Sequence, residues 1–173
     1  MDRMNTQLTH EHTDFTKKQF PITIVCDHIK SPANIGSIFR LADSFGVQKI
    51  YFCGQDIPIN STRMLRTARS TTDKIQFEYD ISTQEVLQQI EKNDNTFIAL
   101  EITSQSMPIW KFDFKKAKHI ILWIGGERNG ISASVLNKID TTLHIPMFGK
   151  NSSMNAATAT GIALYEITKQ YCF

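Results

Sequence analysis

The sequence predicts an α/β fold in which a mainly parallel sheet carries helices on both faces. Two observations lead to this prediction. Short runs of β-branched and apolar residues alternate along the chain with segments of helical periodicity. Some of these runs, such as Ile120 to Ile124, are apolar at every position. A continuous apolar run is typical of a strand that is buried on both faces, as strands are in a parallel sheet covered by helices.

The length of the chain predicts one domain. Its 173 residues, of which 41% are hydrophobic, suffice for one well-buried core and are too few for two ordinary domains. The first 18 residues are polar and lack apolar periodicity. We therefore expect residues 1–18 to form a flexible tail and residues 19–173 to form the folded domain.

Six segments have the composition and length of β-strands. They are Ile22–Cys26, Lys49–Cys53, Ile75–Phe77, Phe97–Leu100, Ile120–Ile124 and Thr142–Ile145.

Helical segments fill the gaps between these strands. The first helix has apolar residues at a spacing of three and four, with Pro32 at its approach and Gly46 at its end. A second helix is expected over residues 82–92, and the last begins near Ser153. The residues at the start of the last helix, 156–161, are unusually small. Small side chains allow another backbone or a ligand to approach closely, so we expect tight packing there.

Charge alone does not identify a partner, because the formal net charge is only +2. The local pattern is more informative. Arg63, Arg66 and Arg69 recur at every third position, which would place them along one side of a helix. Residues 115–118 contain a second basic cluster. Each cluster is either a solvated face or a set of contacts to nucleic-acid phosphates.

Nothing in the sequence indicates export, membrane insertion or a metal site. The first 18 residues contain acidic residues where a signal peptide needs an apolar run. The longest apolar run is far shorter than the roughly 20 residues that span a bilayer. The three cysteines and five histidines do not have metal-ligand spacing. We therefore expect a cytoplasmic protein that binds neither a membrane nor a metal.

Three loops concentrate glycine and polar residues next to expected helices. They comprise residues 32–40, 125–131 and 146–155. The second and third follow predicted strands directly. In open α/β sheets, ligands bind where loops leave the carboxyl ends of the strands. A site built from the second and third loops is therefore expected.

Each polar residue in these loops also has a purely structural interpretation. The glycine pair at 125–126 forms only a tight turn in this view, and Glu127 is a helix first-turn charge. Asn34, Ser153 or Asn155 would each act as a helix N-cap.

Arg40 is harder to explain structurally. It interrupts a helix between apolar neighbours, and a partly buried arginine needs partners. The sequence also lacks the glycine-rich motifs of dinucleotide-binding and P-loop proteins and the G-x-S-x-G motif of hydrolases. The common nucleotide and acyl-transfer sites are therefore not expected.

The three loops, in this order, resemble the three motifs of the SpoU (TrmH-like) methyltransferases of the SPOUT superfamily. The first motif, Asn-x-Gly followed by Arg and Ala-x-x-x-Gly, corresponds to residues 34–46. The second, Gly-x-Glu-x-x-Gly, corresponds to residues 125–130, and the third, Ile-Pro-Met with a later Gly and Ser-x-Asn, to residues 145–156. The departures include Gly126, where Asn is common, and Met154, where Leu is usual. The resemblance covers nearly the whole chain.

This resemblance implies a fold and a cofactor that composition does not show. Members of the family bind S-adenosylmethionine in a deep trefoil knot near the C-terminus, a rare exception to unknotted topology. They are usually homodimers whose sites are completed by both subunits. The positions implied to bind the cofactor are Leu100, Glu101, Gly125, Gly126, Ile145, Met147, Ser153 and Met154.

The activity implied is methyl transfer to a ribose 2′-hydroxyl of RNA. By resemblance, Arg40 would act near the 2′-oxygen, either as the base or as an electrostatic anchor. Asn34 would hold Arg40 or the ribose, and Glu127 would accept hydrogen bonds. Ser153 and Asn155 would position the substrate.

The acceptor implies RNA rather than DNA as the partner, because DNA lacks the 2′-hydroxyl. We expect tRNA ahead of rRNA, and we expect the arginines at 63, 66 and 69 to contact its phosphates. Three other functions stay open. They are a non-catalytic RNA-binding protein on the same fold, a methyltransferase acting on a base or a protein, and an unrelated small-molecule enzyme.

Overall fold

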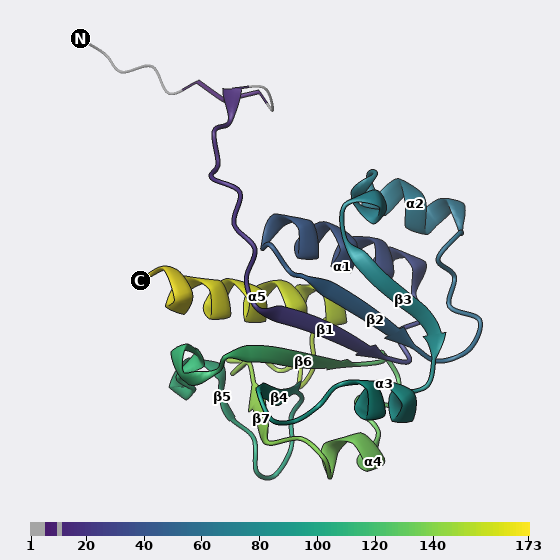
Figure 1. Ribbon diagram of the computed structural model, residues 1–173, viewed down its shortest axis with the longest axis vertical. Coiled ribbons are helices and arrows are strands. Elements are labelled where there is room, and N and C mark those ends of the chain that lie inside the picture. Colours follow the sequence, from purple (N-terminus) through teal and green to yellow (C-terminus); the bar gives the residue numbers. More distant parts are fainter. Residues whose placement is uncertain (1–5, 10–11) are drawn as a thin grey trace.

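A computed structural model describes residues 6–9 and 12–173. The flexible tail expected over residues 1–18 stays a prediction, because residues 1–5, 10 and 11 lie outside the described part. From Thr13 to Gln19 the chain forms neither helix nor strand and extends away from the folded body (Figure 1). Phe20 is buried, and its ring lies 5.9 Å from that of Tyr171 near the end of the chain.

The described residues form a seven-stranded sheet in the order β3-β2-β1-β6-β4-β7-β5, and every pair of neighbouring strands is parallel. The strands are β1 (Ile22–Asp27), β2 (Lys49–Cys53), β3 (Gln76–Ile81), β4 (Asn95–Leu100), β5 (Met107–Pro108), β6 (His119–Gly125) and β7 (Thr141–His144).

Helices cover both faces of this sheet (Figure 1). One core cluster joins the sheet to α1, α2 and α5, and a second joins the other face to α3 and α4. The predicted α/β fold with a mainly parallel sheet is therefore confirmed. The helices are α1 (Pro32–Ser44), α2 (Thr62–Ala68), α3 (Thr83–Gln89), α4 (Ala133–Leu136) and α5 (Ala156–Cys172).

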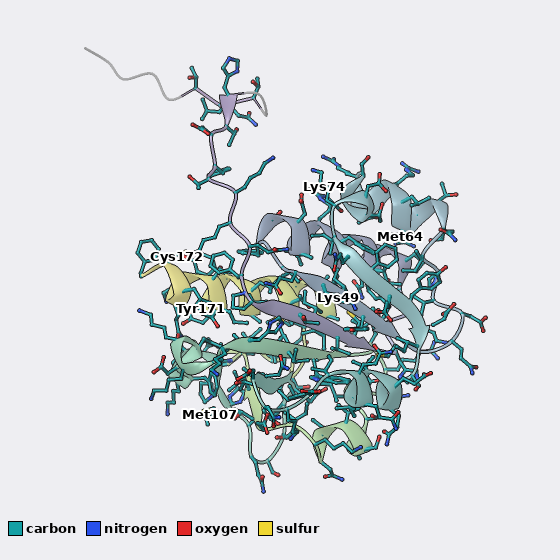
Figure 2. All side chains as sticks on the ribbon, in the orientation of Figure 1. Lys49, Met64, Lys74, Met107, Tyr171 and Cys172 are labelled. Carbon is teal, nitrogen blue, oxygen red and sulfur yellow. The ribbon has the colours of Figure 1, made fainter. Side chains whose placement is uncertain are left out.

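The first helix follows from its sequence. Ser31 caps α1, Pro32 begins it, and the apolar stripe predicted for it is buried from Ile35 to Ala42. Gly36 allows α2 to pack closely, because a Cβ atom at this position would lie 2.6 Å from the carbonyl oxygen of Met64. Figure 2 shows Met64 at this helix pair. The glycine of the Asn-x-Gly motif therefore has a packing role.

Several predicted boundaries were wrong. The strand predicted over residues 75–77 continues to Ile81, and the helix predicted over 82–92 ends at Gln89. The backbone of Ile90 is already extended. The last helix begins at Ala156 rather than near Ser153, because Asn155 is its N-cap. The two-residue strand β5 was not expected.

The structure also bears on membranes and cysteines. Among the described residues, none of the helices combines the length and the apolar composition that a bilayer span requires. Cys26 and Cys53 are buried and unpaired, and Cys172 is exposed at the end of α5 (Figure 2). No cluster of possible metal ligands occurs in the part of the chain that the structure describes.

Candidate functional site

A cavity of about 670 Å³ lies at the carboxyl ends of β4, β6 and β7, where the start of α5 closes it. This is the place expected for ligands in an open α/β sheet. Each of the positions implied to bind a cofactor lines the cavity, although their contact with a cofactor stays a prediction. They are Leu100, Glu101, Gly125, Gly126, Ile145, Met147, Ser153 and Met154.

The loop after β6 forms one wall of this cavity and is built on close backbone contacts. The amide of Gly130 donates to the carbonyl of Gly126 at 3.0 Å. A Cβ atom at Gly125 would overlap the backbone of Gly130, and one at Gly126 would lie 2.6 Å from the carbonyl oxygen of His28. The glycine pair therefore does more than form a tight turn. The close approach of His28 leaves no room for a side chain at position 126.

Glu101 fixes this loop from β4. Its Oε2 accepts a hydrogen bond from the amide of Ile131 at 3.1 Å, and its Oε1 accepts one from the amide of Ile102 at 3.0 Å. Both oxygens are therefore engaged by the backbone. The carboxylate shapes the cavity wall by tying the end of β4 to the end of the loop.

A chain of hydrogen bonds joins the three predicted loops. The side-chain amide of Asn34 donates to Oε1 of Glu127 at 2.7 Å, and Nδ2 of Asn155 donates to Oδ1 of Asn34 at 2.8 Å. Asn34 is only 7% exposed. An ionised carboxylate can only accept, so Glu127 requires the NH₂ group of Asn34 to face it and leaves the oxygen for Asn155. Three residues from distant parts of the sequence thus form one oriented unit.

This network revises the structural interpretations of its members. Asn34 is not the N-cap of α1, because Ser31 has that position. Glu127 lies in a turn rather than in a helix, where it also accepts from the amides of Lys30 and Ser31 at 3.5 and 3.3 Å. Asn155 is indeed an N-cap, since its Oδ1 accepts from the amide of Thr158 at 3.1 Å. It therefore combines a structural role with membership of the network.

Arg40 lies outside the first cavity and is exposed. The expectation that it is partly buried and paired was wrong, and it forms no side-chain hydrogen bond or ion pair with the described residues. Six positions separate it from Asn34, which places it about 120° around the helix axis. It lines a groove of about 620 Å³ between α1 and α5. Asn155 lines both this groove and the first cavity.

The other predicted residues are less closely grouped. Ser153 is exposed at the cavity, and its side chain forms no hydrogen bond to the described residues. Arg63 and Arg66 are exposed on α2. Arg69 is also exposed but follows the helix in a left-handed conformation, with φ at 50°. One continuous helix face carrying all three arginines was therefore a wrong expectation.

Sequence reasoning missed a polar pair at the end of β1. Nδ1 of His28 lies 2.6 Å from Oδ1 of Asp27, and Oδ2 of Asp27 accepts from the amide of Ser132 at 3.0 Å. The available signal was the position of this pair directly after an apolar strand that neighbours β6.

Comparison with known proteins shows the family. Residues 21–165 match the SpoU rRNA Methylase family. A 23S rRNA (uridine(2479)-2′-O)-methyltransferase from Streptomyces viridochromogenes is 32% identical over 149 residues, which cover 85% of this chain and 52% of that protein. A tRNA (guanosine(18)-2′-O)-methyltransferase from Aquifex aeolicus is 26% identical over 89% of this chain and 72% of that protein.

A solved structure agrees with these matches. The SpoU methyltransferase AviRb from Streptomyces viridochromogenes, in complex with the cofactor AdoMet, superposes with a TM-score of 0.79 at 26% identity. The match covers 91% of this chain and 62% of that one. This chain spans about half the length of the Streptomyces relative. By the match over residues 21–165, the chain belongs to the SpoU rRNA Methylase family.

Proposed function

We propose that this protein transfers a methyl group from S-adenosylmethionine to a ribose 2′-hydroxyl of RNA. The observation that carries the proposal is the hydrogen-bonded unit of Asn34, Glu127 and Asn155 beside the cavity at the carboxyl edge of the sheet. Two relatives named for tRNA and rRNA 2′-O-methylation support it. The acceptor makes RNA rather than DNA the substrate.

The cavity fits the proposed cofactor. Its volume of about 670 Å³ is within the range typical of small-molecule sites. Leu100, Ile145 and Met154 offer apolar side chains to an adenine ring, and the backbone of Gly125 and Gly126 offers close polar contacts. We propose that these residues, with Glu101, Met147 and Ser153 in the same wall, hold S-adenosylmethionine. When bound, it would supply a methyl group on an electrophilic sulfonium.

The residues of the protein then have to orient the hydroxyl and accept its proton. When bound, the cofactor would supply its methyl group to the 2′-oxygen and leave as a thioether, and the hydroxyl proton would pass to a substrate phosphate or to Arg40. Asn34 and Asn155 position the ribose from their fixed orientations. Glu127 holds Asn34 in place, and the unengaged hydroxyl of Ser153 contacts the substrate at the cavity rim.

Arg40 acts on the 2′-oxygen in this proposal, and a second copy of the chain completes the site. The groove that Arg40 lines is partly apolar, and Ile162 and Tyr165 are exposed beside it. A homodimer that covers this groove buries both and sets Arg40 at a site shared by two protomers. Arginine is a poor base, because its pKa exceeds about 12. A role as electrostatic anchor, with proton removal assisted by a substrate phosphate, is therefore the first to test against a role as base.

Two further predictions belong to this proposal. We propose the trefoil knot in the segment that leads from β7 into α5, supported by the cavity that this segment shares with the loop after β6. We also propose a cytoplasmic location, which the three unpaired cysteines favour.

To test the proposal, the purified protein is incubated with radiolabelled S-adenosylmethionine and with bulk tRNA or bulk rRNA from a strain that lacks the gene. Labelled RNA is digested to nucleosides. A labelled 2′-O-methylnucleoside from one RNA class, with tRNA expected first, supports the proposal and identifies the substrate class. A methylated base would contradict the ribose assignment. RNA binding without label would favour the non-catalytic alternative.

Variants of Arg40 accompany this assay. Arg40→Ala should remove the label, whereas Lys111→Ala, an exposed lysine that lines neither the cavity nor the groove, should not. Arg40→Lys separates the two roles, because lysine keeps the positive charge and lowers the pKa of the group. Partial activity with an unchanged pH profile supports the anchor. A pH profile that shifts with the substitution supports the base.

A further inference from the structure

We propose that a second cavity, on the opposite side of the loop after β6, binds a phosphodiester of the RNA that flanks the target nucleotide. The residues that would contact the phosphate oxygens are His28, Lys30 and Arg128. This inference rests on the proposed function and deepens it, because it names how the substrate is held beside the reaction site.

The second cavity has a volume of about 720 Å³ and lies at the carboxyl end of β1. It shares Gly126, Glu127, Arg128 and Gly130 with the first cavity, so the loop is a common wall of both. A polynucleotide whose ribose reaches the first cavity therefore has a neighbouring, solvent-accessible recess for the adjacent part of its backbone.

His28 is fixed in this cavity by a buried carboxylate. Asp27 is 1% exposed, and its Oδ1 accepts from Nδ1 of His28 at 2.6 Å, while its Oδ2 accepts from the amide of Ser132. Because the carboxylate only accepts, Nδ1 of His28 carries a proton, and Nε2 donates to a ligand oxygen when the imidazole is in its doubly protonated imidazolium form. The imidazole remains 60% exposed, and its Nε2 has no hydrogen-bond partner among the described residues. An oriented but unengaged nitrogen is thus available to a ligand.

The backbone of His28 supports a role for its side chain. Its φ of 58° lies in the left-handed region, which a residue with a Cβ atom adopts at a cost in free energy. Glycine would adopt the same conformation without strain. The position therefore retains an imidazole where the backbone alone would favour glycine, and the side chain adds the contact to Asp27.

The charges of the cavity favour an anion. Its carboxylates are already engaged, Asp27 by His28 and Ser132, and Glu127 by the side chain of Asn34 and two backbone amides. Lys30 and Arg128 are exposed and form no ion pair with any residue in the described ranges. The groups left to meet a ligand are therefore cationic or hydrogen-bond donors. Lysine, arginine and the imidazolium form of histidine are suited to phosphate oxygens.

The first test measures RNA affinity over a range of salt concentrations for Lys30→Ala and for the matched control Lys111→Ala. Bulk unmethylated tRNA and rRNA are the probes. Loss of one phosphate contact should weaken binding roughly tenfold near 0.1 M salt and reduce the salt dependence by about one unit of log affinity per log salt. Affinity for S-adenosylmethionine should not change. An unchanged salt dependence in Lys30→Ala, or an equal loss in Lys111→Ala, would overturn the inference.

The second test separates a ligand contact from a structural role of His28. His28→Gly removes the imidazole and relieves the backbone, whereas His28→Asn restores a donor and tolerates the left-handed conformation. We expect His28→Gly to raise KM for RNA roughly tenfold with kcat nearly unchanged, and His28→Asn to recover part of this loss. Equal KM values in His28→Gly and wild type would overturn the inference.

Measurements on the wild-type protein distinguish failure of the phosphodiester site from failure of the proposed methyl transfer. If wild type methylates RNA and the variants bind RNA normally, only the phosphodiester site is wrong. If wild type binds RNA with the expected salt dependence but transfers no methyl group, the proposed activity is wrong and the binding site stands. Absence of RNA binding by wild type would overturn both.

Discussion

Asn34 is the residue on which the three loops depend, because it uses its amide nitrogen for Glu127 and its oxygen for Asn155. Its chemistry is difficult to replace. A carboxylate at this position would face another carboxylate, and an alkyl side chain would leave two partners without hydrogen bonds. Because Glu127 and Asn155 are exposed, water replaces part of what they lose, and the two lost hydrogen bonds together cost about 1–3 kcal/mol.

We predict that Asn34→Ala lowers the free energy of unfolding by about 1–3 kcal/mol and reduces kcat/KM about a hundredfold. Asn34→Asp should be more severe, since the new carboxylate repels Glu127. Chemical denaturation and methyl-transfer kinetics measure the two effects. Asn137→Ala is the control, because this exposed asparagine follows α4 and lines neither cavity. Wild-type kinetics in Asn34→Ala would contradict the positioning role.

The three cysteines differ in burial and therefore in reactivity. Burial raises the pKa of Cys53 to about 12, and burial likewise raises the pKa of Cys26. Thiolates are the reactive form, so neither residue should react in the folded protein near pH 8. We predict that iodoacetamide modifies Cys172 alone at this pH, and all three cysteines in denaturant. Mass spectrometry counts the adducts, and rapid native labelling of Cys53 would show that the core opens.

Helix α2 and Arg69, the residue that follows it, carry the arginines that we expect to contact RNA phosphates. Replacement of Arg63, Arg66 and Arg69 by Glu should weaken RNA binding and its salt dependence, because phosphate contacts are replaced by repulsion. Affinity for S-adenosylmethionine should stay at the wild-type value, since none of the three lines the cavity. Filter binding at several salt concentrations measures the effect. Unchanged RNA affinity would remove α2 from the RNA interface.

The elements that the sequence predicts well are those with continuous apolar runs or long apolar stripes. Strands β1, β2, β4 and β6 and helix α1 lie at the expected positions, because burial requires apolar residues throughout the strands and at a regular spacing along the helix. Strand β3 was predicted too short. It lies at the edge of the sheet, and its exposed polar residues give no continuous apolar run. Helix α4, with four residues, is too short to show periodicity.

The site was predictable in part for similar reasons. The positions of the second and third loops could be predicted because each follows a predicted strand. The resemblance to the family motifs indicated which polar residues in the loops belong to the site. The hydrogen bonds that join Asn34 to Glu127 and Asn155 depend on tertiary geometry that no local pattern contains. Burial of Arg40 was inferred from apolar neighbours, but its position on α1 points it to the groove beside α5. The pair Asp27 and His28 has no local motif at all.

The groove between α1 and α5, with Ile162 and Tyr165 exposed beside it, favours a homodimer. Tyr165 is 61% exposed beside this groove, and Tyr165→Arg would introduce a charge from each protomer into the proposed interface. We predict that the wild type sediments as a dimer of the 19.7 kDa chain, whereas the variant sediments as a monomer. Methyl transfer should fall at least roughly tenfold, because in the proposed dimer both protomers contribute to the site. Tyr165→Phe is the control and should stay dimeric and active.

A monomeric but fully active Tyr165→Arg protein would show that each protomer contains a complete site. A dimeric variant would show that the interface lies elsewhere on the molecule.

The hydrogen bonds between Asn34, Glu127 and Asn155 have a consequence for how the protein matures. Residue 155 is synthesised after Asn34 and Glu127, and the helix that it caps completes the cavity wall. A nascent chain that has formed β1 and α1 therefore has no assembled pocket, however well its first half is folded. Binding of the proposed cofactor, S-adenosylmethionine, would therefore report completed folding, because only a chain in which α5 has docked has the full cavity.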